Sequence, residues 1–76
     1  MTTHRPPAGT PLTPRELEIL TIVATGVDYA TIARRLWIAE GAVKTQMSRA
    51  LRKLDARGRQ DAVKIATRLG LIGGQP

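Results

Sequence analysis

The chain has 76 residues, a formal net charge of +6 at pH 7 and no cysteine, so it holds at most one domain and neither a disulfide framework nor a thiolate metal site. His4 is its single histidine, which excludes a histidine-based metal cluster or catalytic dyad within one chain, and we expect no enzyme activity, metal or cofactor. No apolar run approaches the ~20 residues of a membrane span and the start lacks a signal peptide's apolar stretch, so we expect a cytoplasmic protein with no membrane partner.

Residues 1–11 hold three of the five prolines and predict a disordered or loosely attached arm. The last residues, 73–76, predict a flexible tail. Between them, residues 12–72 are expected to form the folded domain. No segment alternates between apolar and polar residues and no Asn-Gly or Asp-Gly turn occurs, so we expect no strand. Four helical segments remain, and the predicted fold class is all-α.

The first two helices are marked by their caps. Thr13, Pro14 and Glu16 have the spacing of a capping box with proline at the first helical position, and Gly26 suits the end of this helix. Asp28 is a good N-cap for a short helix over residues 29–36. Residues 37–39 then form a connection, in which we expect Trp37 to pack at the corner between two helices.

The third helix, over residues 40–54, separates into two faces. One face is apolar and consists of Val43, Met47, Ala50, Leu51 and Leu54. The other face is polar and basic and consists of Lys44, Thr45, Ser48, Arg49 and Arg52. This partition predicts a helix that packs on the core with one side only.

The fourth helix is expected over residues 59–69, with Gly58 as its cap. Its predicted inward face includes Leu69, and Gly70 followed by Leu71 resembles a Schellman ending. The excess of basic residues lies in this helix and the one before it, because residues 13–36 carry equal numbers of acidic and basic side chains. A basic balance on a small folded domain favours a polyanionic partner, most often nucleic acid.

Residues 29–54 form a helix-turn-helix by pattern, with residues 40–54 as the recognition helix. Such a helix shows one face to the core and the other to the major groove. Lys44 can donate to guanine O6 and N7. Thr45 and Ser48 are short and allow close approach. Arg49 and Arg52 are long enough to reach guanine or phosphate.

At these residues the sequence resembles the LuxR or GerE type of bacterial transcription regulator, over about residues 12–72. The matching segments are Leu12-Thr13-Pro14-Arg15-Glu16, Ile19-Leu20, Val23-Ala24-x-Gly26, Ile32-Ala33-x-x-Leu36-x-Ile38, Val43-Lys44, Arg52-Lys53-Leu54, Arg59-x-x-Ala62-Val63 and Gly70-Leu71-Ile72. The resemblance implies a four-helix domain that binds double-stranded DNA with its third helix and forms dimers with its fourth. It implies DNA contacts at Lys44, Thr45, Gln46, Ser48, Arg49, Arg52 and Arg35.

The chain departs from the family pattern at four positions. The family usually has serine at Asp28 and Ala39, threonine at Ala42 and histidine at Gln46. Asp28 is expected to repel a phosphate. The two alanines remove hydroxyl groups near the start of the third helix, which weakens its cap, and Glu40 partly offsets this loss through the helix dipole.

Ile65 lies beside the predicted core stripe of the fourth helix, on a neighbouring stripe with Arg68 and Ile72. A spare isoleucine on a small domain indicates a contact surface, and the family forms dimers with this helix. We therefore predict a homodimer interface at Ile65, Arg68 and Ile72. A lone surface isoleucine without a partner is the alternative.

Two alternatives concern the function. Tyr29-Ala30-x-Ile32-Ala33, Glu40-Gly41-Ala42-Val43-Lys44 and Ser48-Arg49-Ala50 also look like region four of small bacterial sigma factors, although residues 59–72 fit only the LuxR type. A protein-binding adaptor that keeps the fold and engages RNA polymerase, a sigma factor or a larger regulator is the second alternative. The leading prediction is a sequence-specific DNA-binding transcription regulator, cytoplasmic and nucleoid-associated.

Overall fold

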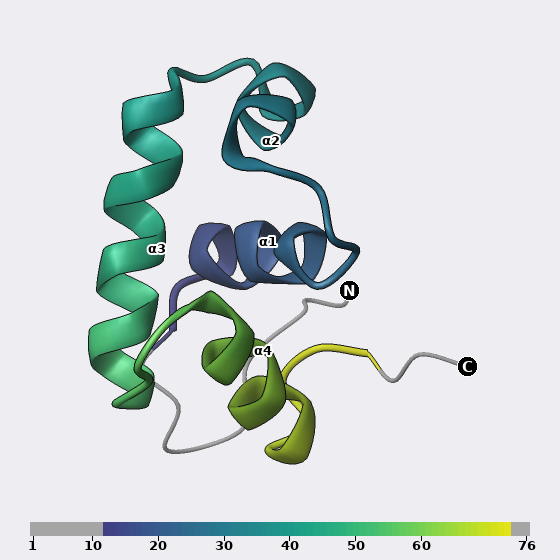
Figure 1. The fold of residues 1–76 in the computed structure, drawn as a ribbon, viewed down its shortest axis with the longest axis vertical. Helices are drawn as coiled ribbons and strands as arrows, with labels where there is room; N and C mark the ends of the chain where they lie inside the picture. Colours follow the sequence, from purple (N-terminus) through teal and green to yellow (C-terminus); the bar gives the residue numbers. More distant parts are fainter. Residues whose placement is uncertain (1–11, 74–76) are drawn as a thin grey trace.

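The computed structural model describes residues 12–73 and contains four helices and no strand in that range. They are α1 (Pro14–Val23), α2 (Tyr29–Leu36), α3 (Glu40–Leu54) and α4 (Arg59–Arg68) (Figure 1). The predicted all-α class and order of helices are confirmed, and α4 ends one residue earlier than expected. Residues 1–11 and 74–76, where the arm and the tail are expected, lie outside the described part. Within it, no helix is both long and apolar enough to cross a bilayer.

Side-chain hydrogen bonds determine where α1 and α2 begin. The Thr13 hydroxyl accepts from the Glu16 N–H at 3.1 Å, and the Glu16 carboxylate accepts from the Thr13 N–H at 2.9 Å. This confirms the predicted capping box. The Asp28 carboxylate accepts from the Thr31 N–H at 2.9 Å at the start of α2. Both caps satisfy N–H groups that have no partner inside their helix.

The helices α3 and α4 begin without a side-chain cap, because Ala39 and Gly58 occupy their N-cap positions. In α4, the Asp61 carboxylate accepts from the Arg57 N–H at 2.9 Å and so joins the first turn to the connection before it. In α3, the acidic residue of the first turn is Glu40, whose charge is favourable beside the positive end of the helix dipole. The predicted weakening of the α3 cap is therefore confirmed, because no side chain caps the start of this helix.

The core forms around one face of α3. This helix packs against each of the other three and stands along one side of them (Figure 1). Val43, Met47 and Ala50 are buried and Leu51 and Leu54 are half-buried, which confirms the predicted apolar stripe. The remaining buried apolar residues come from every part of the described chain: Leu12, Ile19, Leu20, Val23, Ile32, Ala33, Ala62, Ala66 and Ile72.

Three helices are followed by a residue in the left-handed conformation. These residues are Trp37 after α2 (φ 60°), Asp55 after α3 (φ 57°) and Gly70 after α4 (φ 75°). The next N–H in each case donates to a carbonyl of the last turn: Ile38 to Ala33 at 3.0 Å, Ala56 to Leu51 at 2.9 Å and Leu71 to Ala66 at 2.8 Å. These bonds define Schellman motifs. The ending predicted from Gly70 and Leu71 is confirmed, and two further helices end in this way without glycine.

The end of α4 corrects two predictions. Leu69, expected on the inward face, is 54% exposed, and Ile72, expected on the exposed stripe with Ile65, is only 6% exposed and belongs to the core. The turn at Gly70 reverses the chain and brings Leu71 and Ile72 back onto the helices, which explains the burial of Ile72. Leu69 precedes this turn, directly after the last residue of α4. Helical periodicity therefore no longer describes which side chains face inward.

Trp37 corrects a third prediction. It was expected to pack at the corner between α2 and α3, but it is 92% exposed. Because its backbone is left-handed, Trp37 does not continue the helical geometry of α2, and its side chain does not follow the apolar face of that helix. Leu36 and Ile38, on either side of it, pack against the core instead.

Candidate nucleic-acid interface

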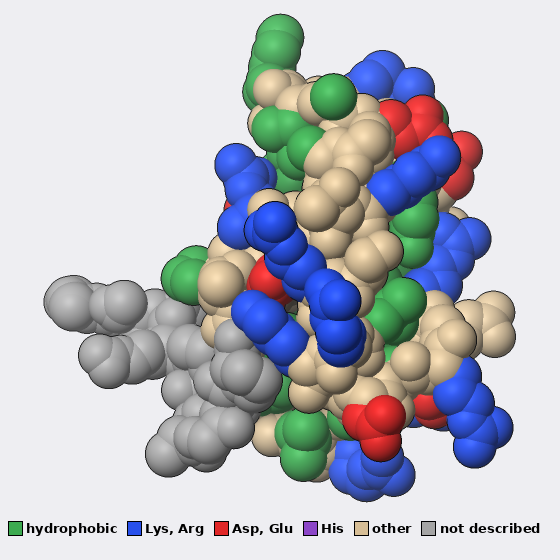
Figure 2. All heavy atoms as spheres, turned by 90° about the vertical axis from the view of Figure 1, so that its left-hand side faces the viewer, with side chains coloured by type: hydrophobic (Ala, Val, Ile, Leu, Met, Phe, Trp, Pro, Cys, Tyr) green, Lys and Arg blue, Asp and Glu red, His purple; other side chains and the backbone are tan. Residues whose placement is uncertain are grey.

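The outward face of α3 carries most of the side chains that the sequence assigns to DNA. Its exposed members are Lys44, Thr45, Ser48, Arg49 and Arg52, and Gln46 is half-buried. Figure 2 looks onto the side of the molecule where α3 lies and shows Lys and Arg side chains gathered along it. One helix thus presents hydroxyl groups and cations together, which are groups that donate to base edges and phosphates.

Two of these side chains already have partners within α3. The Lys44 ammonium lies 3.8 Å from a carboxylate oxygen of Glu40, one turn earlier, and both side chains are exposed. The Thr45 hydroxyl donates to the Gly41 carbonyl at 3.0 Å. An exposed ion pair contributes at most about 1 kcal/mol, so Lys44 can exchange Glu40 for a stronger acceptor at small cost.

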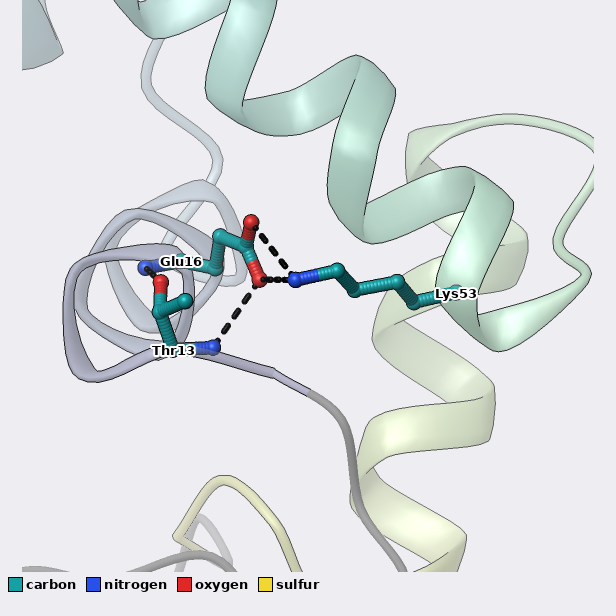
Figure 3. A network of polar contacts seen from close by, with 3 residues as sticks. All are labelled: Thr13, Glu16 and Lys53. Atoms are coloured by element: carbon teal, nitrogen blue, oxygen red, sulfur yellow. Dashed lines mark hydrogen bonds and ion pairs between the residues drawn. The ribbon is translucent and has the colours of Figure 1, made fainter.

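Lys53 lies on the same helix but points toward α1 (Figure 3). Its ammonium lies 2.9 and 3.1 Å from the two carboxylate oxygens of Glu16, a residue that is 1% exposed. Since Glu16 also completes the cap of α1, one carboxylate joins the first turn of α1 to the last turn of α3. Lys53 is therefore part of the scaffold that holds α3, and the outward face excludes it.

The charge of Glu16 is maintained by its partners. Burial by itself raises the pKa of this carboxyl group, because burial disfavours the charged form. The hydrogen bonds from Lys53 and from the Thr13 N–H, together with the positive charges of Lys53 and Arg49, outweigh burial and hold the pKa of Glu16 below its ordinary value of 4.5. Glu16 is therefore ionised at neutral pH, and loss of Lys53 would leave its charge without its principal partner.

The ion pair between Glu16 and Lys53 was not predicted, although the position of Glu16 in the sequence indicates that it has a partner. Glu16 precedes Ile19, Leu20 and Val23 at the spacing of one helix face, and all four are buried. A carboxylate inside an apolar stripe indicates a buried partner. Its identity does not follow from local pattern, because Lys53 is 37 residues further along the chain.

The helix α2 adds basic residues at one end and an acidic residue at the other. Arg34 and the predicted site residue Arg35 lie in its last turn and are exposed. At its start, hydrogen bonds from Thr31 lower the pKa of Asp28, so this group is negative at neutral pH, and its repulsion of a phosphate stays a prediction. Among residues 12–73, no three acidic or histidine side chains come together as metal ligands would.

The predicted dimer surface on α4 is present only in part. Ile65 is half-buried and Arg68 is exposed, whereas Ile72 is in the core. Leu69 lies one turn after Ile65 and is exposed. Residues four apart on a helix share a face, so the apolar surface here consists of Ile65 and Leu69, with Arg68 beside it.

Comparison with known protein families matches residues 10–66 to the family described as bacterial regulatory proteins, luxR family. Response regulator RamR of Streptomyces coelicolor is 45% identical over 60 residues, which cover 79% of this chain and 30% of the relative. The quorum sensing-dependent transcriptional regulator RpaR of Rhodopseudomonas palustris is 49% identical over 61 residues, 80% of this chain and 25% of the relative.

A third relative is the nitrate/nitrite response regulator protein NarL of Escherichia coli, which is 43% identical over 51 residues. These residues cover 67% of this chain and 24% of the relative. The chain thus spans no more than about a third of the length of the relatives that it matches.

Proposed function

Because the chain belongs to the luxR family of bacterial regulatory proteins, we propose that it is the sequence-specific DNA-binding part of a transcription regulator and that α3 enters the major groove. The observation that carries this proposal is the partition of α3. Its apolar face is buried against the other helices, and its polar and basic face is exposed along its length. A helix held in this way offers its donors to the groove without unfolding.

The roles of the side chains follow from their length and position. Lys44, Thr45, Gln46 and Ser48 lie in the central part of α3 and read base edges. Arg49 contacts a base or a phosphate, and Arg52 and Arg35 contact phosphates. A base contact confers sequence preference, whereas a phosphate contact confers affinity and orientation.

The bacterial chromosome is the partner in this proposal, and the protein accordingly acts in the cytoplasm at the nucleoid.

The homodimer belongs to the same proposal. A second copy of the chain covers Ile65 and Leu69 on α4, with Arg68 at the rim. Two copies related by a two-fold axis present two α3 helices to two half-sites of one operator. The exposed Leu69, next to the half-buried Ile65 on one face of α4, supports this arrangement.

Selection of bound duplexes from a random pool, followed by sizing of the complex, tests the proposal. We expect the pool to converge on one motif with two-fold symmetry and the complex to contain two chains. A pool that stays random while the folded protein captures RNA polymerase or a sigma factor would instead favour the adaptor.

A further inference from the structure

The fold does not require a tryptophan at position 37. It is the single tryptophan of the chain and is 92% exposed. Its backbone adopts the left-handed conformation with φ 60°, which is unfavourable for a bulky residue. Glycine would make the same Schellman hydrogen bonds without steric conflict. Neither the turn nor the core therefore explains a tryptophan at this position.

The surroundings of Trp37 indicate a partner of negative charge. It lies in the connection between α2 and α3, at the N-terminal end of α3 (Figure 1). Arg34 and Arg35 precede it in the last turn of α2. The acidic neighbour, Glu40, lies in the first turn of α3, where the positive end of the helix dipole offsets its charge. The exposed indole thus lies between the basic last turn of α2 and the N-terminal end of α3.

We propose that Trp37 packs on the sugar–phosphate backbone of bound DNA, at the edge of the major groove that α3 enters. This inference rests on the proposed function. An indole has a flat apolar face that can cover a deoxyribose and one N–H that can donate to a phosphate oxygen. Sugar and phosphate carry no sequence information, so the contact strengthens binding to every duplex.

Because the indole carries no charge, its contact with DNA should depend on salt differently from that of a lysine or arginine. A lysine or arginine that contacts a phosphate releases a counterion, so its removal lowers the salt dependence of binding by about one unit of slope. Tryptophan is neutral. Loss of Trp37 should therefore lower affinity at every salt concentration and leave the slope unchanged.

The experiment compares wild type, Trp37→Gly and Trp37→Phe on a labelled duplex enriched from a random pool and on a scrambled duplex of equal length. We expect Trp37→Gly to bind both duplexes about tenfold more weakly at every salt concentration, as for the loss of a hydrogen bond to a charged group. Trp37→Phe keeps an aromatic face and loses the N–H, so its affinity should lie between the two.

A folding control accompanies the binding data. Because glycine tolerates the left-handed conformation, the thermal midpoint of Trp37→Gly should equal or exceed that of wild type. Asp55→Gly is the matched control, since Asp55 has φ 57° at the other end of α3. A large fall in the midpoint of Trp37→Gly alone would show that the indole stabilises the fold, and would overturn the proposal.

Fluorescence of the single tryptophan reports the contact directly. Addition of either duplex should change the emission of Trp37 from that of a solvent-exposed indole. If wild type binds no duplex, the proposed function and this inference fail together. If it binds DNA while emission and the affinity of Trp37→Gly stay unchanged, this inference alone fails and the proposed function stands.

Discussion

Lys44 and Arg52 share the outward face of α3 but are eight residues apart, so we expect different losses when each is removed. Lys44→Ala should cost about 1–3 kcal/mol on the selected duplex and relax preference at one base pair. Arg52→Ala should weaken binding to all duplexes alike and lower the salt slope by about one unit. Fluorescence anisotropy on selected and scrambled duplexes over a range of salt concentrations measures both effects.

Lys64→Ala is the control for these variants, because Lys64 is exposed on α4 and its removal changes the net charge equally. It should bind DNA close to wild type. If Lys44→Ala and Arg52→Ala also bind every duplex like wild type, α3 does not read DNA, and the adaptor becomes the better account.

Glu16 is expected to matter for stability far more than its neighbour Glu18. Glu16→Gln keeps a capping amide but removes the charge that faces Lys53, so it should lower the free energy of unfolding by about 1–3 kcal/mol at pH 7. Glu18→Gln removes an exposed pair with Arg15 and should cost no more than about 1 kcal/mol. Chemical denaturation of both variants makes the comparison, and equal costs would contradict the buried ion pair.

The lowered pKa of Glu16 also predicts how stability depends on pH. The folded protein holds this group ionised to lower pH than the unfolded chain does, so its contribution is complete above the ordinary value of 4.5 and is lost as pH falls below it. Asp28 acts in the same direction. Glu16→Gln should therefore approach wild type in stability as the pH is lowered. A constant difference between pH 7 and pH 3 would exclude this role for Glu16.

At the scale of single helices, α4 carries the prediction on assembly. An aspartate in place of Ile65 or Leu69 would put a charge into the apolar surface of the proposed dimer, so each variant should shift the equilibrium to monomer in sedimentation experiments. Thr67→Asp, exposed on the other side of the core stripe, should dimerise like wild type. A wild-type protein that is monomeric at high micromolar concentration contradicts the prediction.

The helices themselves could be predicted because their signals are local. Thr13 with Glu16, and Asp28 before α2, mark helix starts by hydrogen bonds within three residues. The stripe of α3 follows from a period that any helix must have. The predicted family is confirmed by the match of residues 10–66, which span these helices.

The wrong predictions for Ile72 and Trp37 concern residues where the chain leaves a helix, and the missed ion pair joins residues far apart in the chain. Ile72 is buried because the turn at Gly70 returns it to the core, and Trp37 is exposed because it ends α2 in the left-handed conformation. Lys53 pairs with Glu16, which lies 37 residues earlier in the chain. Helical periodicity predicts neither the burial of Ile72, nor the exposure of Trp37, nor the partner of Lys53. The DNA contacts of α3 and the dimer stay predictions.

At the scale of the whole molecule, the outward face of α3 depends on the core behind it. Met47 is 1% exposed and lies between Lys44 and Arg52 in the chain, on the opposite side of α3. Met47→Ala should cost about 2–5 kcal/mol, a large share of the stability of so small a domain. Ser48→Ala should leave the thermal midpoint nearly unchanged. Circular dichroism of both variants during heating provides the test, and equal midpoints would place Met47 outside the core.

The residues that bound α3, extended Ala39 before it and left-handed Asp55 after it, limit the number of base pairs that one chain would read under the proposed function. They stop the helix at both ends, so its exposed face cannot grow by another turn. From Lys44 to Arg52 the helix rises about 12 Å, close to the width of the major groove. A helix of this reach covers only a few base pairs, and so short a word recurs by chance every few hundred base pairs of a genome. If α3 reads DNA as proposed, one chain alone would carry too little information to find an operator, and the proposed dimer would supply a second reading helix at a defined spacing.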